Sequence, residues 1–190
     1  RLFIVGYNAD DYGKMIERMV KKIKPILLEE SIKGVLVFGD TNSTLGGSIS
    51  AKQLNLPIFH VEAGLRSFNR LMPEENNRII TDHLSSLLFC PSKNAVSNLM
   101  EENLNDGVIL SGDVMLDVYL KFSSYKDNLK DDLKTSKFIL ATIHRKENID
   151  SAEKLSAIFK NLNKINEHRQ IIMPLHPHTK QKVEKYKIKS

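Results

Sequence analysis

Charged side chains gather in residues 60–78, the segment HVEAGLRSFNRLMPEENNR, which follows an apolar run. Glu62 stands where the apolar run ends, and Glu74 stands at the start of an expected helix. Carboxylates on separate segments can act as general base and general acid when their environments differ. The guanidinium groups of Arg66 and Arg78 suit a bound phosphate, which they can hold through paired hydrogen bonds. These residue types therefore predict proton transfer beside a bound anion.

Further polar residues follow the other apolar runs of the chain. Because ligands of open α/β sheets bind outside the carboxyl ends of the strands, residues at these ends are candidates for a shared site. In the first part of the chain they are Gly39, Asp40, Thr41, His60, Ser111, Gly112 and Asp113. In the second part they are His144, Arg145, Glu147, Asn148 and His176. We expect the two groups to face each other across a cleft.

Each of these candidates also has a purely structural explanation. Asp40 could cap the helix that follows it, and Glu62 could form an ion pair with Arg66. Glu74 could be a first-turn acid that favours the helix dipole, and His144 could be an ordinary loop histidine. The joint placement of Asp40, Glu62 and His144 favours the functional interpretation.

His176 and His178 raise the separate question of a metal site. Zinc sites in proteins use three or four protein ligands, and no convincing third ligand accompanies this pair. We therefore expect both histidines to be structural and predict no metal site.

An alternation of apolar runs and helical patterns must position these residues. Continuous apolar runs that end in turns are typical of strands covered on both faces of a parallel sheet. We expect strands at residues 34–40, 56–62, 87–91, 107–113, 138–144 and 170–177. Their alternation with helices predicts an α/β fold of two Rossmann-like, doubly wound domains. The polar stretch 123–137 is the expected linker between domains at residues 1–122 and 138–190.

Local signals also predict where helices begin and end. Pro73 is expected near the first position of one helix, and Ser92 is expected to cap the next. A helix that starts near Tyr12 should break or kink at Pro25, because proline removes a backbone donor. The helix expected at residues 151–167 places five apolar residues on one face, namely Leu155, Ile158, Phe159, Leu162 and Ile165.

The composition limits the classes of partner. The net charge is +5, but the lysines concentrate near the two ends with few aromatic residues among them, so we expect no nucleic-acid partner. No apolar run reaches the ~18 residues of a membrane span, and no secretory signal is visible. The single Cys90 excludes an intramolecular disulfide and favours a reducing compartment. We therefore expect a cytoplasmic protein without a membrane partner.

Several blocks of this sequence occur together, in the same order and spacing, in one known family. They are GDT, HVEAGLRS, PEENNR, LFCPS, LSGDVMLD and ATIHRKEN. Through these blocks the chain closely resembles the non-hydrolysing UDP-N-acetylglucosamine 2-epimerase family over nearly its whole length. The resemblance implies two Rossmann-like domains, as in the B-type glycosyltransferases, and interconversion of UDP-N-acetylglucosamine with UDP-N-acetylmannosamine for cell-surface polysaccharide synthesis.

The family pattern extends beyond both ends of these 190 residues. Its N-terminal glycine-rich loop with Arg, Pro and Glu has no counterpart here. Neither does its later Asp-Ser-Gly-Gly segment, which holds the uridine diphosphate. We therefore expect the chain to be a central fragment of a longer enzyme and to be inactive on its own.

The resemblance also implies roles for individual residues. Positions that the family uses for catalysis are matched by Asp40, Glu62, Glu74 and His144. The expected substrate contacts are Gly39, Thr41, His60, Arg66, Arg78, Arg145, Glu147 and Asn148. In bacterial members a second UDP-sugar acts as an activator, and the positions that match its contacts are Glu74, Arg145 and His176.

The implied reaction eliminates UDP to give 2-acetamidoglucal and adds it back on the other face, without a redox cofactor. A UDP-sugar substrate and a homodimer are the expected partners, with UDP-N-acetylglucosamine as a candidate activator. Gly39 and Gly64 are expected to let the backbone approach the ligand.

Other functions are open at this point. One is epimerisation of a modified sugar, such as a UDP-2,3-diacetamido uronic acid. Another is a hydrolysing 2-epimerase, which releases free N-acetylmannosamine. Outside sugar epimerisation, the candidates are a non-catalytic UDP-sugar-binding module and a metal-dependent phosphohydrolase.

Overall fold

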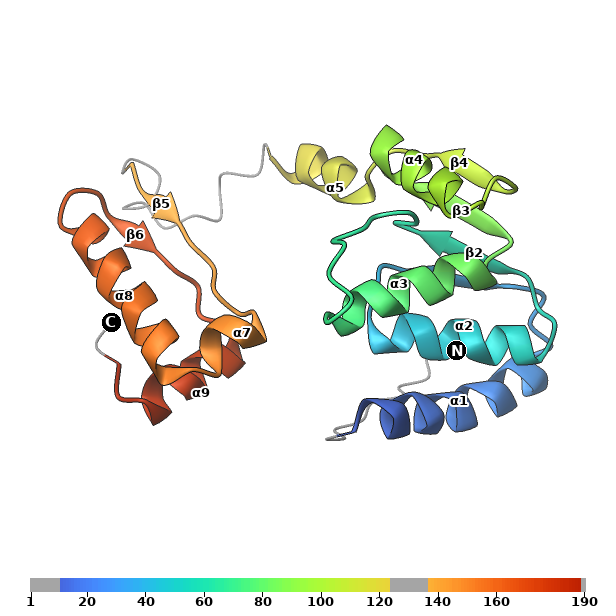
Figure 1. The fold of residues 1–190 in the computed structure, drawn as a ribbon, viewed down its shortest axis with the longest axis horizontal. Coiled ribbons are helices and arrows are strands. Elements are labelled where there is room, and N and C mark those ends of the chain that lie inside the picture. The colour runs from blue at the N-terminus through green and yellow to red at the C-terminus, as the bar shows by residue number, and fades with distance from the viewer. Residues whose placement is uncertain (1–10, 124–136, 189–190) are drawn as a thin grey trace. The chain divides into compact units, whose positions relative to one another are not determined.

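The computed structural model of the protein describes residues 11–123 and 137–188 (Figure 1). The chain divides into two compact units, Arg1–Phe122 and Ser123–Ser190. Both contain parallel strands with helices between them, so the expected α/β fold class is confirmed. The expected linker at residues 123–137 lies almost entirely outside the described residues.

The first unit is built on a four-stranded parallel sheet. Its strands, in spatial order, are β1 (Val35–Phe38), β2 (Ile58–Val61), β3 (Leu87–Cys90) and β4 (Val108–Leu110). Its helices are α1 (Tyr12–Glu29), α2 (Asn42–Gln53), α3 (Pro73–Leu84), α4 (Lys93–Glu101) and α5 (Val114–Phe122). All four strands lie where the apolar runs predicted them. Their sequential order places the loops that follow β1 and β2 side by side.

The register of the sheet sorts the strand residues between its two faces. Val37, His60 and Leu88 are aligned across three neighbouring strands, and all three are buried. Side chains alternate along a strand, so Leu36 and Phe38 point to the other face, where they are 54% and 55% exposed. The buried row therefore belongs to the core, and it includes one histidine.

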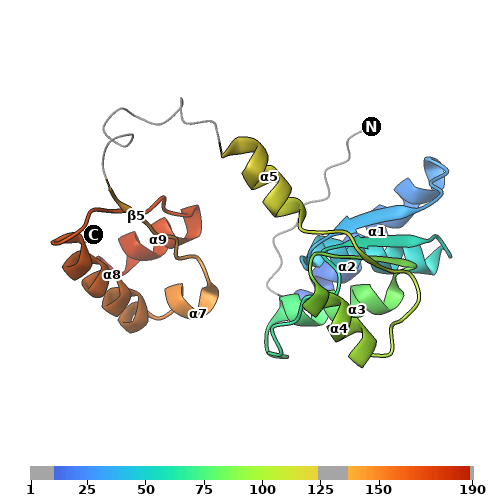
Figure 2. The same ribbon diagram turned by 90° about the horizontal axis from the view of Figure 1, so that it is seen from above.

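Capping residues explain the starts of the helices that flank the sheet. Thr41 caps α2 through a hydrogen bond from the Thr44 amide, and Ser92 caps α4 as predicted. Pro73 occupies the start of α3, also as predicted. Of the expected break or kink at Pro25, the break was wrong, because α1 continues through it to Glu29. Helix α1 packs along α2 (Figure 2), and Pro25 itself is exposed.

The second unit contains a two-stranded parallel sheet of β5 (Ile139–Leu140) and β6 (Ile171–Ile172). Its helices are α7 (Lys146–Ile149), α8 (Ala152–Asn166) and α9 (Pro177–Lys185). Both strands are shorter than the apolar runs predicted. The core is a cluster of four buried apolar residues, Ile149, Leu155, Phe159 and Val183. Two of them come from the predicted apolar face of α8, whereas Ile165 on that face is 46% exposed.

Within residues 11–123 and 137–188, no helix combines the length and the apolar character needed to cross a bilayer.

Candidate functional site

Asp40 and Glu62 meet at one guanidinium group at the carboxyl ends of β1 and β2. The Nη2 atom of Arg78 on α3 lies 2.5 Å from the Oδ2 atom of Asp40. Its Nη1 atom donates to the backbone carbonyl of Glu62 and lies 3.9 Å from the Glu62 carboxylate oxygen Oε2. Asp40 and Glu62 are 31% and 27% exposed, while Arg78 is only 9% exposed. The two acids are therefore open to a ligand, and the arginine supports them from behind.

The backbone at this point adopts uncommon conformations. Glu62 has a φ of 69°, in the left-handed region, which costs a residue with a side chain about 1–2 kcal/mol. Gly39 has a φ of 64°, and a Cβ atom placed on it would lie 3.3 Å from the Glu62 Oε2 atom. Strained residues of this kind cluster at functional sites. The strain at Glu62 therefore supports the choice of this sheet edge as the site.

Two residues without a predicted role support the Asp40 turn, Asn77 directly from α3 and Tyr12 through Asn77 from α1. Asn77 donates its amide to the backbone carbonyl of Asp40 at 2.8 Å. Tyr12 on α1 donates its hydroxyl to the side-chain oxygen of Asn77. Burial raises the pKa of Tyr12, and the negative charge of Glu74 raises it further. Glu74 therefore lies near this chain of contacts, although it is exposed.

Helix α3 is the element that organises the site. Its buried residues are all polar or charged: Glu75, Asn77, Arg78, Thr81 and Asp82. A soluble helix normally buries an apolar stripe, and this one does the reverse. The sequence does carry the signal, since polar residues repeat at helical spacing while Ile80 is 42% exposed. Reading α3 as a buried polar face could have identified Asn77 and Asp82 from the sequence.

His60 and Arg66 lie behind the site, so the expected substrate contacts of their side chains are not supported. His60 is fully buried, with its Nε2 atom 2.8 Å from the Gly39 carbonyl and its Nδ1 atom 2.7 Å from Asp82. Arg66 has a 2% exposed side chain and bonds to Asp82 and Glu102, so the pairing with Glu62 was wrong. Burial would lower the pKa of Arg66, but Glu102 and Asp82 raise it above its ordinary value.

The loop between β2 and α3 is fixed by Glu75. Its carboxylate accepts hydrogen bonds from the Ser67 amide, the Ser67 hydroxyl and the Phe68 amide at 2.7 to 2.9 Å. Burial alone would raise the pKa of Glu75, but these hydrogen bonds lower it overall. In the same loop, Gly64 approaches a helix rather than a ligand. A Cβ atom on Gly64 would lie 2.3 Å from the Ala95 carbonyl oxygen, so close packing against α4 explains the glycine, and its expected role beside a ligand stays a prediction.

Cys90 ends β3 beside this buried network. Its side chain is fully buried, and its pKa is raised to about 11 by burial and by the charge of Asp82. A thiol must ionise to react as a nucleophile. Cys90 is therefore a structural residue.

In the second unit, His144 and His176 lie together. Their rings stack with centroids 5.8 Å apart and an interplanar angle of 30°. His176 also caps α9, because its Nδ1 atom accepts a hydrogen bond from the His178 amide. The loop before His144 is tied to α9 by a 2.6 Å hydrogen bond from Thr179 to the Ile143 carbonyl. Both histidines are exposed.

Three more predicted residues follow His144 directly. The carbonyl of Arg145 accepts hydrogen bonds from the amides of Asn148 and Ile149, which starts α7. Arg145 and Glu147 are exposed, and Asn148 is half-buried. The structure thus gathers the predicted residues of the second unit at the end of β5. Their placement opposite Asp40 and Glu62 stays a prediction.

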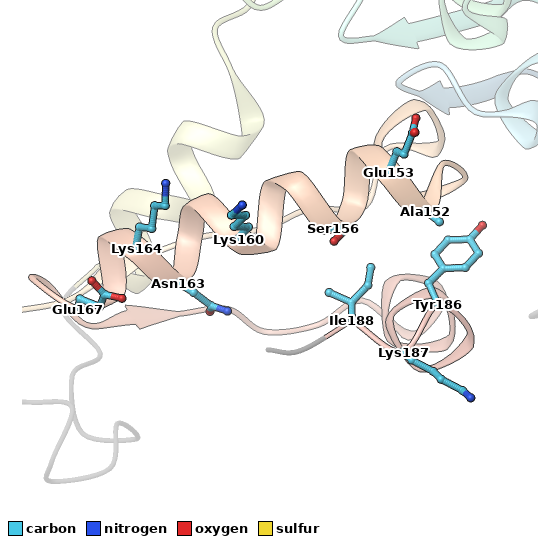
Figure 3. Close-up of a pocket in the computed structure, with 10 residues that line it drawn as sticks. All are labelled: Ala152, Glu153, Ser156, Lys160, Asn163, Lys164, Glu167, Tyr186, Lys187 and Ile188. Carbon is cyan, nitrogen blue, oxygen red and sulfur yellow. The ribbon is translucent and has the colours of Figure 1, made fainter.

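No group of three or more potential metal ligands occurs in the part of the chain that the structure describes. A groove of about 800 Å³ lies between α8 and the turn after α9 (Figure 3). It is bordered by Lys160, Asn163 and Tyr186, and none of the predicted site residues lines it. Open grooves of this kind do not by themselves indicate a catalytic centre.

Comparison with known proteins gives a consistent result. The family model described as UDP-N-acetylglucosamine 2-epimerase matches residues 5–189. A UDP-N-acetylglucosamine 2-epimerase homolog of Methanococcus maripaludis is 48% identical over 190 residues, which cover 97% of this chain and 53% of the relative. The UDP-2,3-diacetamido-2,3-dideoxy-D-glucuronate 2-epimerase of Pseudomonas aeruginosa is 43% identical, over 96% of this chain and 52% of the relative.

A solved structure is similar as well. It is the crystal structure of Methanocaldococcus jannaschii UDP-GlcNAc 2-epimerase in complex with UDP-GlcNAc and UDP, with a TM-score of 0.85 and 34% identity. The match covers 95% of this chain and 52% of that one. The chain spans about half the length of the curated relatives it matches.

Proposed function

The chain belongs to the UDP-N-acetylglucosamine 2-epimerase family, and from that premise we propose that its protein interconverts UDP-N-acetylglucosamine and UDP-N-acetylmannosamine without hydrolysis. The observation that carries the proposal is the pair of partly exposed carboxylates, Asp40 and Glu62, held by Arg78 at the carboxyl edge of the sheet. Two acids at one point, with a fixed positive charge behind them, suit removal and return of a proton.

The proposed reaction changes the configuration at C2 in two steps. A carboxylate takes the C2 proton while the bond between C1 and the diphosphate oxygen breaks, which leaves 2-acetamidoglucal and UDP. In the second step UDP adds back to C1, and C2 receives a proton on the opposite face. The net reaction moves no electrons to or from the sugar, so it needs no redox cofactor. Asp40, Glu62 and Glu74 are the proposed acids and bases.

The residues of the second unit have proposed roles at the diphosphate. His144 contacts the leaving phosphate and compensates its developing charge, which is where fixed donors contribute most to rate. Arg145 suits the same anion because its planar group forms paired hydrogen bonds. Glu147 and Asn148 are the further contacts proposed here. The stacking of His144 on His176 supports a shared anion-binding surface at the end of β5.

The regulatory and cellular parts of the proposal rest on the family resemblance. Glu74, Arg145 and His176 are the proposed contacts of a second UDP-sugar that acts as an activator. We infer a cytoplasmic homodimer that supplies cell-surface polysaccharide synthesis and binds neither nucleic acid nor membrane.

A modified UDP-sugar is the second candidate substrate. The 43% identity to the diacetamido-glucuronate 2-epimerase of Pseudomonas aeruginosa supports it. Both substrates would use the same acids at C2, so the catalytic residues do not indicate which one the enzyme prefers. Reaction rates measured on the two purified UDP-sugars would identify the preferred substrate.

Proton NMR of UDP-N-acetylglucosamine in D₂O tests the proposed function on the complete protein that contains residues 1–190. Epimerisation without hydrolysis should yield UDP-N-acetylmannosamine with deuterium at C2 and no free sugar. Release of free N-acetylmannosamine would indicate the hydrolysing reaction instead. Binding of the UDP-sugar without any C2 exchange would indicate a non-catalytic module. The same experiment on the isolated 190-residue chain should show no turnover.

A further inference from the structure

His60 is buried in the sheet between two groups that can only accept hydrogen bonds. Its Nε2 atom lies 2.8 Å from the backbone carbonyl oxygen of Gly39, and its Nδ1 atom lies 2.7 Å from the Oδ1 atom of Asp82. The other Asp82 oxygen, Oδ2, accepts from the Gly64 amide at 3.1 Å and from Arg66 at 2.7 Å. These two donors, one of them a guanidinium, favour the carboxylate form of Asp82.

With a carboxylate at Asp82 and a carbonyl at Gly39, both ring nitrogens of His60 face acceptor atoms, and both hydrogen bonds form when both nitrogens donate. With two N–H groups on His60, Arg66 and His60 would supply two positive charges, and Asp82 and Glu102 two negative ones. His83 also bonds to Glu102, at 3.0 Å. A buried network in which every member has partners is rigid, whereas a partly satisfied one is costly.

The network ends at the residue that precedes the proposed catalytic acid. The Gly39 carbonyl belongs to the peptide group that joins Gly39 to Asp40, so a hydrogen bond to it fixes the orientation of that peptide. The amide of Gly39 is held as well, by the Val61 carbonyl at 3.0 Å. Asn77 and Arg78 then hold the carbonyl and the carboxylate of Asp40. His60, which also bonds to Asp82 on α3, supplies the contact to the Gly39 carbonyl.

We propose that His60 is a positioning residue, doubly protonated, whose Nε2–H group fixes the Gly39–Asp40 peptide and thereby aims the Asp40 carboxylate. This proposal rests on the proposed function, since aiming Asp40 matters only for a reaction at this site. His60 does not touch the substrate. Its other N–H group bonds to Asp82, which Arg66 holds in place together with Glu102. Through His60, the turn after β1 is thus anchored to these buried residues.

A matched pair of substitutions in the complete protein separates positioning from folding. In His60→Gln the amide nitrogen reaches as far as Nε2 and can still donate to Gly39. In His60→Asn it reaches only as far as Nδ1 and can donate to Asp82 instead. We expect kcat for C2–H exchange to fall on the order of 10²-fold in His60→Asn, because misplacement of a catalytic group by about 1 Å has that effect. KM should stay close to the wild-type value, and His60→Gln should retain most of kcat.

Equal losses of kcat in the two variants, or unchanged rates per folded molecule in both, would overturn the positioning role. Melting temperatures of both variants are recorded alongside, since a purely structural histidine lowers them without separating the two rates. If the wild-type protein shows no C2–H exchange at all, the proposed function fails and the positioning role falls with it.

The protonation of His60 can be measured without any activity assay and without a variant that might unfold. Nitrogen-15 NMR of the wild-type protein labelled at histidine should show one buried ring with protons on both nitrogens. Cross-peaks from that ring to strand β2 identify it as His60. A ring with one protonated nitrogen would refute the proposed hydrogen-bond pattern even in an active enzyme.

Discussion

Helices α3 and α8 bury opposite kinds of side chain. Helix α8 buries Leu155 and Phe159, which belong to the apolar face that its sequence predicts. Helix α3 buries only polar and charged residues, among them Arg78 and Asp82. The side chains of α8 are interchangeable with others of similar volume, whereas those of α3 depend on particular donors and acceptors.

The buried face of α8 should contribute mainly to stability, and the buried face of α3 mainly to the geometry of the site. Burial of apolar side chains stabilises the fold, and a helix that buries ion pairs contributes less, because desolvation offsets the attraction between charges. Helix α3 nevertheless fixes the turn at Asp40, the carbonyl of Glu62 and the loop at Ser67. Substitutions around α3 should therefore affect rate most, and substitutions in α8 should affect stability alone.

The largest effect is expected for Glu62→Gln in the complete protein. The change keeps the shape of the side chain and removes a base, and loss of a general base costs about 10²–10⁴-fold in rate. The kcat for C2–H exchange in D₂O should fall by that order while UDP-sugar binding, measured by calorimetry, stays near the wild-type level. Glu101→Gln on the exposed surface of α4 is the control. Normal exchange by a folded Glu62→Gln protein would leave Asp40 or Glu74 as the candidate base.

A substitution in the apolar core of the second unit should lower stability and leave the rate of the reaction unchanged. Phe159→Ala leaves a cavity in the core of the second unit and should lower the free energy of unfolding by about 3–5 kcal/mol. Urea denaturation measures the loss, and the exchange rate per folded molecule should not change. Ile165→Ala, at an exposed position on the same helix, should change stability by less than about 0.5 kcal/mol. A lower rate in folded Phe159→Ala protein would contradict the expectation that α8 affects stability alone.

Arg78→Lys tests whether the two acids depend on a planar guanidinium. Lysine keeps the charge but cannot bond to Asp40 and to the Glu62 carbonyl in the same geometry. One hydrogen bond to a charged group is lost, so the free energy of unfolding should fall by about 1.5–3 kcal/mol. A reduced kcat should accompany the lower stability. Arg70→Lys, an exposed arginine of the same segment, is the control, and an equal response of both variants would argue against a special role for Arg78.

Acid should weaken the polar region through Glu75 and Glu102. Hydrogen bonds from Arg66 lower the pKa of Glu102, and hydrogen bonds from Ser67 and Phe68 outweigh burial to lower that of Glu75. Because both folded-state pKa values lie below the ordinary value of 4.5, the stability is present above that pH and is lost as the pH falls through the lowered values.

Urea unfolding at several pH values below 5 measures this effect, which is the smallest of the four. Glu75→Gln and Glu102→Gln should each make the free energy of unfolding depend less steeply on pH. An unchanged slope in both variants would show that other groups control the acid response.

The features that the sequence predicted correctly are local ones. The four strands of the first unit follow from continuous apolar runs, and the starts of α3 and α4 follow from Pro73 and Ser92. Placement of Asp40 and Glu62 at one sheet edge follows from topology alone, since parallel strands share their carboxyl ends. Such signals need no knowledge of tertiary contacts.

The partners of individual side chains were not predictable in the same way. Arg66 stands four residues from Glu62, yet it bonds to Asp82 and to Glu102, 36 residues away along the chain. Pro25 lies inside α1 at an exposed position, and the helix continues past it to Glu29, although proline removes a backbone donor. The partners of Arg66 are decided by tertiary contacts.

The buried Cys90 makes this chain suitable for fluorescence measurements of the distance between the two units. It is the single cysteine of the 190 residues, and a thiol with a pKa near 11 hardly forms the thiolate that maleimide dyes attack. Cysteines introduced at the exposed positions Glu101 and Lys160 would then take up donor and acceptor dyes without removal of the native one. Energy transfer between them, recorded with and without UDP-sugar, would report the distance between the units in solution.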